Sequence, residues 1–119
     1  MKDFVIPKAL KKGDTIALIS LSGGRAGDED MLYRYQIGKQ RLEEIWCVKV
    51  IPTPNALKGS QFLYEQPEAR AEDLMWALKN KEVNGIICMM GGDDSYRVFP
   101  YIDLDVIRDN PKVFMGYSD

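Results

Sequence analysis

Short apolar runs alternate with amphipathic segments along the chain. Each run is bounded by Gly, Asp, Asn or Pro, the pattern of buried strands that end in turns. The predicted strands cover residues 15–20, 47–51, 85–90 and 112–115. Helical spacing of apolar positions predicts helices over residues 30–45 and 67–78, with shorter helical turns from residue 95 and over residues 105–108.

Strands that alternate with helices predict an α/β fold with a parallel sheet and right-handed crossovers. We expect a Rossmann-like or flavodoxin-like sheet of about four strands with helices on both faces. The alternating run 47–51 suits an edge strand, and the continuous run 85–90 suits a strand covered on both faces. Gly38, in the apolar stripe of the first helix, predicts a close approach to the sheet, and residues 52–62 are predicted to be a loop.

The length of 119 residues suits one domain, residues 1–119, rather than two. With 16 basic and 18 acidic residues the net charge is −2, which gives no reason to expect nucleic acid or a membrane as partner. The first residues lack the apolar core of a signal peptide. The use of only two cysteines makes a reduced, cytoplasmic protein the expected class. Two cysteines without metal-site spacing, and no histidine, predict neither a metal nor a cofactor.

Three polar or glycine-rich segments follow predicted strands: residues 20–24, 91–95 and 116–119. Ligands of open parallel sheets collect outside the carboxyl ends of the strands, so we expect these segments to share one edge. Ser118, two residues after Gly116, is a candidate nucleophile on a tight turn. The Gly-x-Ser pattern alone is a weak signal, which more often marks an ordinary loop serine than a nucleophile.

The Gly91-Gly92 pair is either a simple turn or a pair of open amides that hold an anion. Asp93 or Asp94 is expected to cap the next helix. Arg97 could bind a substrate carboxylate, although pairing with a nearby acid is the favoured interpretation. Gly91, Asp93 and Arg97 are therefore candidates for substrate binding. Residues 20–24 do not form a dinucleotide-binding fingerprint.

Several segments together resemble the LD-carboxypeptidase family of serine peptidases, which includes muropeptide LD-carboxypeptidases and microcin C self-immunity peptidases. They are residues 91–97, 100–103 and 110–119, supported by residues 7–16 and 68–75. The resemblance implies that Ser118 is the nucleophile and that the amides of Gly92 and Asp119 form the oxyanion hole. It also implies a homodimer, and a following C-terminal domain that supplies the glutamate and histidine of the triad. Residues 45–47 stand where a glycine often ends the first helix in relatives.

The leading hypothesis is thus the N-terminal domain of a serine peptidase that acts on a muropeptide, small peptide or peptidyl-nucleotide, inactive without its C-terminal domain. One alternative is a nucleotide-binding phosphotransferase that uses the Gly-Gly-Asp loop. Asp94, where such kinases prefer glycine, counts against it, because a further negative charge beside a triphosphate is unfavourable. A second alternative is a non-catalytic anion-binding module.

Overall fold

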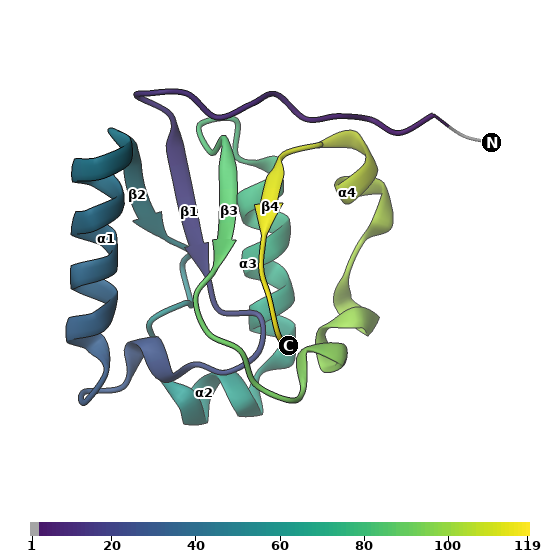
Figure 1. Ribbon diagram of the computed structural model, residues 1–119. Coiled ribbons are helices and arrows are strands. Elements are labelled where there is room, and N and C mark those ends of the chain that lie inside the picture. Colours follow the sequence, from purple (N-terminus) through teal and green to yellow (C-terminus); the bar gives the residue numbers. More distant parts are fainter. Residues whose placement is uncertain (1–2) are drawn as a thin grey trace.

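The computed structural model describes residues 3–119 and contains one parallel sheet (Figure 1). Its strands are β1 (Thr15–Ile19), β2 (Lys49–Pro52), β3 (Gly85–Cys88) and β4 (Val113–Met115). Their order is β2-β1-β3-β4, and every neighbouring pair is parallel. The predicted α/β class is confirmed, and the order equals the first four strands of the flavodoxin-like arrangement. β2 lies at one edge, as its alternating pattern indicated, and β4 at the other.

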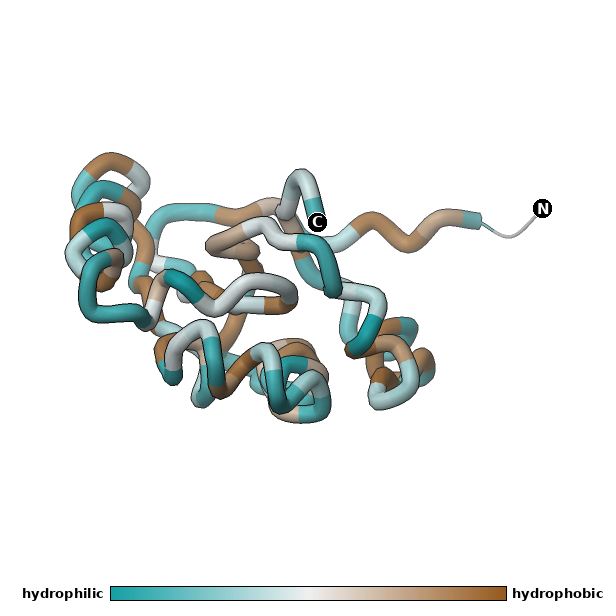
Figure 2. The backbone as a smooth tube through the Cα atoms, turned by 90° about the horizontal axis from the view of Figure 1, so that it is seen from below, coloured by the Kyte–Doolittle hydropathy of each residue, from teal (hydrophilic) through white to brown (hydrophobic). Residues whose placement is uncertain are grey.

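Helices cover both faces of the sheet, as predicted. In the sheet, β2 lies on one side of β1, whereas β3 and then β4 lie on its other side. Right-handed crossovers therefore place α1 on one face of the sheet and α3 and α4 on the other face (Figures 1 and 2). The helical elements are α1 (Leu32–Trp46), α2 (Ser60–Glu65), α3 (Pro67–Lys79), α4 (Leu104–Asp109) and the 3-10 segments η1 (Arg25–Gly27) and η2 (Ser95–Tyr101).

The hydrophobic core has one layer on each face of the sheet. On the α3 face, strand residues pack against the inner side of α3; the buried cluster is Ala17, Ile19, Ile86, Leu74, Ala77, Leu78 and Val83. On the α1 face, Ile16, Leu18, Val48 and Val50 pack against side chains that include Tyr35 and Leu42 of α1. Every residue of α1 keeps some exposure, so the α3 layer is the better sealed of the two.

Three local expectations need correction. β3 is not covered on both faces: Ile86 is fully buried on the α3 side, but Ile87 is half-buried because α1 lies over the β2 side of the sheet (Figure 1). The predicted loop over residues 52–62 in fact contains the start of α2. Gly38 does not touch the sheet, since a Cβ there would meet nothing within 4 Å.

The start of α2 depends on a residue far away in the sequence. The carboxylate of Asp28 accepts hydrogen bonds from the hydroxyl of Ser60 and, at 2.8 Å, from its backbone amide. These bonds satisfy a helix N-terminal donor. They also hold the pKa of Asp28 below its ordinary value. Such a contact between residues 28 and 60 cannot be read from local propensity.

The segment that precedes β1 runs past the amino ends of the strands in an extended conformation (Figure 1). Residues 1 and 2 lie outside the described residues. Among residues 3–119 there is no helix of sufficient length and apolarity to cross a membrane.

Candidate functional site

The three segments predicted to share an edge meet at the carboxyl ends of the strands, the side that faces the viewer in Figure 2. The amide of Gly23 donates to the carbonyl of Gly91 at 3.1 Å. The hydroxyl of Ser22 donates to the carboxylate of Asp119. This edge contains the switch point between β1 and β3, where the chain leaves in opposite directions and ligands of such sheets bind.

Ser118 adopts a backbone conformation that is unusual for a residue with a side chain. Its φ is +59°, in the left-handed region, and the residue is exposed. Strained residues of this kind persist where the surroundings enforce them, and a nucleophile on a strand-end elbow is one such case. Gly116 leaves room for the side chain of Cys88, because a Cβ at position 116 would lie 3.2 Å from the Cys88 sulfur.

Close packing against the neighbouring loops explains the glycine pair. A Cβ on Gly92 would lie 2.3 Å from the hydroxyl oxygen of Ser22 and 2.9 Å from the amide nitrogen of Gly23. A Cβ on Gly91 would lie 3.2 Å from Oγ of Ser118 and 3.9 Å from the amide nitrogen of Asp119. Only glycine leaves the space between the glycine pair and Ser118 open.

Asp119 ties the segment after β4 to both other loops. Its carboxylate accepts from the Ser22 hydroxyl, from the Ser95 amide at 2.9 Å and from the Ser95 hydroxyl at 2.7 Å. The hydrogen bonds from Ser22 and then Ser95 lower the pKa of Asp119 to about 2. The carboxylate is therefore ionised at neutral pH and caps the start of η2.

The expectation that Asp93 or Asp94 caps η2 is wrong. Asp94 occupies the cap position without a side-chain cap, because its carboxylate lies between two guanidinium groups. Burial opposes ionisation, but hydrogen bonds from Arg70 and Arg97 outweigh it and hold the pKa of Asp94 below its ordinary value. Asp93 is exposed on the same loop.

Arg97 pairs with an acid, as favoured from the sequence, and that acid is Asp94 at 3.0 Å. Its guanidinium also donates to the carbonyl of Tyr64 at 2.8 Å and lies 4.9 Å from the centroid of the Tyr64 ring. Of the three candidates for substrate binding, Gly91 thus faces Ser118 and Asp93 is exposed, whereas Arg97 is already engaged within the protein.

Two charged residues of α3 were missed as site residues. The side chain of Arg70 is 0% exposed and contacts the loops after β1 and β3. Asp73 is 2% exposed and orders the loop after β2, where it accepts from the Thr53 hydroxyl at 2.6 Å and the Asn55 amide at 2.9 Å. The available signal was their spacing, since positions 70 and 73 share the inner face of the helix with Leu74 and Ala77.

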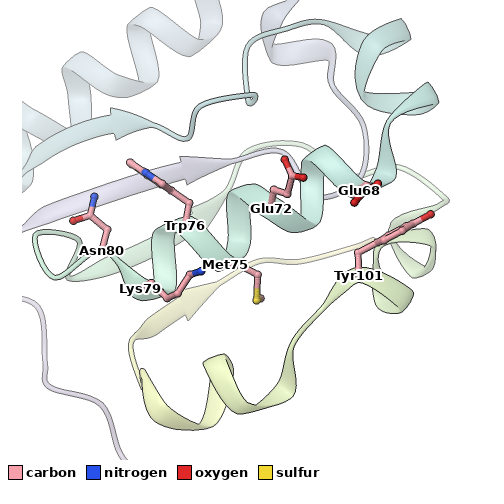
Figure 3. Close-up of a pocket in the computed structure, with 7 residues that line it drawn as sticks. All are labelled: Glu68, Glu72, Met75, Trp76, Lys79, Asn80 and Tyr101. Carbon is pink, nitrogen blue, oxygen red and sulfur yellow. The ribbon is translucent and has the colours of Figure 1, made fainter.

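A cavity of about 430 Å³ adjoins Ser118 and is lined mainly by apolar side chains, among them Leu21, Val98 and Phe114. A separate groove of about 750 Å³ runs along α3 and is lined by Glu68, Glu72, Met75, Trp76, Lys79, Asn80 and, from η2, Tyr101 (Figure 3). The groove shares no lining residue with the cavity at Ser118. Within residues 3–119, no three His, Cys, Asp or Glu side chains are grouped to hold a metal ion.

Comparison with known families gives a match over most of the chain. Residues 16–119 match the family model described as the LD-carboxypeptidase N-terminal domain, of peptidase family S66. The chain belongs to the LD-carboxypeptidase family. The resemblance read from the glycine pair and the terminal Gly-Tyr-Ser-Asp is therefore confirmed at the level of the family.

Individual relatives agree with this assignment. A probable murein peptide carboxypeptidase of Bacillus subtilis is 32% identical over 117 residues, which are 95% of this chain and 34% of that protein. A putative carboxypeptidase of Vibrio cholerae is 40% identical over 114 residues, 94% of this chain and 33% of that protein. The chain spans about a third of the length of these relatives.

Solved structures show the same fold. An MccF-like protein from Streptococcus pneumoniae in complex with AMP has a TM-score of 0.81 and 38% identity, over 89% of this chain and 32% of that one. The microcin C7 self-immunity protein MccF, known from Escherichia coli, in complex with aspartyl sulfamoyl adenosine has a TM-score of 0.80 and 25% identity, over 96% of this chain and 33% of that one.

Proposed function

We propose that this chain is the N-terminal, nucleophile-bearing domain of a serine peptidase that hydrolyses an amide bond near a free carboxylate. The observation that carries the proposal is the exposed Ser118 with a φ of +59°, beside the Gly91-Gly92 backbone. Membership of a carboxypeptidase family favours this function over the phosphotransferase and the non-catalytic module.

The proposed reaction uses Ser118 and two backbone amides. Oγ of Ser118 attacks the substrate carbonyl carbon, and the carbonyl oxygen becomes an oxyanion that accepts hydrogen bonds from the amides of Gly92 and Asp119. The C–N bond breaks, the amine leaves with a proton, and an ester on Ser118 remains until water hydrolyses it. Loss of one oxyanion-hole donor typically lowers kcat by ~10²–10³-fold.

The general base lies outside this chain in our proposal. The sequence has no histidine. Asp119 is too weak a base, because its pKa is about 2 and its carboxylate is occupied by Ser22 and Ser95. We therefore assign the base, and the glutamate that orients it, to a C-terminal domain that follows Asp119. The 119-residue chain alone then has no means to take the proton from Ser118.

Two substrate classes agree with the relatives. One relative is a probable murein peptide carboxypeptidase, and solved relatives are complexes with AMP and with aspartyl sulfamoyl adenosine. We propose a small peptide with a free carboxylate next to the cleaved bond, from either a muropeptide or a peptidyl-nucleotide. The choice between them is assigned to the C-terminal domain.

The test is an assay of the complete protein, with this chain as its N-terminal domain, on a tetrapeptide muropeptide and on a peptidyl-nucleotide. We expect turnover of one class, and loss of turnover in the Ser118→Ala variant. Ser60→Ala, which removes a hydroxyl bonded to Asp28, should retain activity. Turnover by the 119-residue chain alone, or by the Ser118→Ala variant, would contradict the proposal.

A further inference from the structure

The guanidinium of Arg70 lies buried between two of the loops that form the site. Nη1 donates to the carbonyl of Leu21 at 3.1 Å, to the carbonyl of Ser22 at 3.2 Å and to Oδ1 of Asp94 at 3.1 Å. Nη2 donates to Oδ2 of Asp94 at 3.3 Å. One side chain of α3 therefore binds the loop after β1 and the loop after β3 together.

Stability alone does not account for an arginine at this position. The side chain is 0% exposed, and its Nε is buried without an acceptor in the described part of the chain. Burying a guanidinium is costly, and well-packed apolar residues often replace a buried ion pair without loss of stability. The guanidinium is better explained by the two loops that its planar donors hold in place.

The two loops that Arg70 joins determine where the glycine pair sits. The Gly23 amide bonds the Gly91 carbonyl, and the Gly92 backbone lies against the Ser22 hydroxyl. On the other side, Gly91 lies against Ser118. A shift of the Leu21–Ser22 carbonyls would therefore move the glycine pair relative to the Ser118 hydroxyl.

We propose that Arg70 is a positioning residue for the oxyanion hole, which fixes the loops after β1 and β3 so that the glycine-pair amides face Ser118. The catalytic consequence of this inference rests on the proposed function; the structural consequence does not. Arg70 itself contacts no substrate. Lysine cannot replace it, because one ammonium cannot bond two carbonyls and both oxygens of Asp94 in the same plane.

The kinetic test compares Arg70→Lys with Leu78→Ala in the complete protein. Leu78 is a buried residue of the same helix that faces the core, so its truncation weakens the fold without touching either loop. At a temperature where both variants are folded, Arg70→Lys should lower kcat by at least about tenfold with KM nearly unchanged, since misplacement of about 1 Å can cost ~10²-fold. Leu78→Ala should keep the parental kcat. Parental kcat in Arg70→Lys, or an equal loss in both variants, would overturn the inference.

A second measurement needs no turnover. In the 119-residue chain, amide hydrogen exchange at Gly23 reports the bond to Gly91. Arg70→Lys should speed exchange at Gly23 by at least about tenfold while the amide of Ile86, in the sheet, exchanges as before. Asp94→Asn gives the same comparison if Arg70→Lys does not fold. Unchanged exchange at Gly23 in the folded variant overturns the positioning role, whereas absence of Ser118-dependent turnover in the parent protein defeats only the proposed function.

Discussion

The carboxylate of Asp119 binds both the amide and the hydroxyl of Ser95, at 2.9 and 2.7 Å. The residue that follows Ser118 is thereby joined to the first residue of η2 and, through that segment, to the glycine-pair loop. The site is thus a set of three loops connected by hydrogen bonds, with Ser118 in the segment after β4.

The titration of Asp119 should reveal this connection. Its pKa of about 2 is below the ordinary 3.8, so the hydrogen bonds stabilise the folded chain above pH 4 and are lost as the pH falls toward 2. Ser95→Ala removes the hydroxyl donor and should raise the pKa toward 3.8. Carbon-13 NMR of the Asp119 side-chain carboxyl measures both values. Ser60→Ala should leave the pKa of Asp119 unchanged. A titration midpoint near 3.8 for Asp119 in the parent chain would show that its hydrogen bonds to Ser22 and Ser95 do not form.

Gly92→Ala should destabilise the chain. The added Cβ would lie 2.3 Å from the Ser22 hydroxyl oxygen, so the loops must separate at a cost of about 1–3 kcal/mol. Gly38→Ala is the matched control, because its Cβ meets nothing within 4 Å and alanine favours a helix interior by about 1 kcal/mol. Urea unfolding should move the midpoint down for Gly92→Ala and up for Gly38→Ala. Equal midpoints would refute the close packing of the glycine pair.

Cys47 ends α1 with a φ of +55°, in the left-handed region that glycine adopts without strain. Cys47→Gly should therefore raise the free energy of unfolding by about 1 kcal/mol. Cys47→Ala keeps a Cβ and should give no such gain. The prediction fails if denaturant unfolding finds Cys47→Gly no more stable than Cys47→Ala.

An apolar groove of about 490 Å³ remains open on the α1 face, where α1 does not reach β3; its lining includes Ile16, Trp46, Ile87 and Met115. Trp46 is 65% exposed there, and such patches favour association. We expect the 119-residue chain to self-associate, and Trp46→Gln to increase the monomer fraction in sedimentation velocity. Leu104→Gln, at an exposed residue of α4, should not. A parent chain that stays monomeric at high concentration would contradict this prediction.

The sequence was sufficient for the sheet because each strand is a local apolar run, and the alternating pattern of residues 47–51 even placed β2 at an edge. The sequence also predicted that the three loops meet, because parallel topology places the carboxyl ends of all strands at one edge of the sheet. Helix α2 was missed, because its start depends on Asp28.

Contacts between charged residues that lie far apart in the sequence could not be predicted from it either. Asp93 or Asp94 was expected to cap η2, since Asp is a common cap before a helical turn. Instead Arg70 and Arg97 bind the Asp94 carboxylate, and the Asp119 carboxylate accepts the hydrogen bond from the Ser95 amide. Arg70 and Asp73 were not predicted as site residues: their spacing places them on the inner face of α3, but only the packed helix reveals that they bind the loops after the strands.

The most direct measurement of the central claim is covalent labelling of the complete protein with a fluorophosphonate, followed by mass spectrometry of its peptides. We predict one adduct, on the oxygen of Ser118, with loss of turnover in proportion to labelling and no adduct in the Ser118→Ala variant. An active protein that is inactivated through another residue, or that is labelled at Ser118 without loss of turnover, would contradict it.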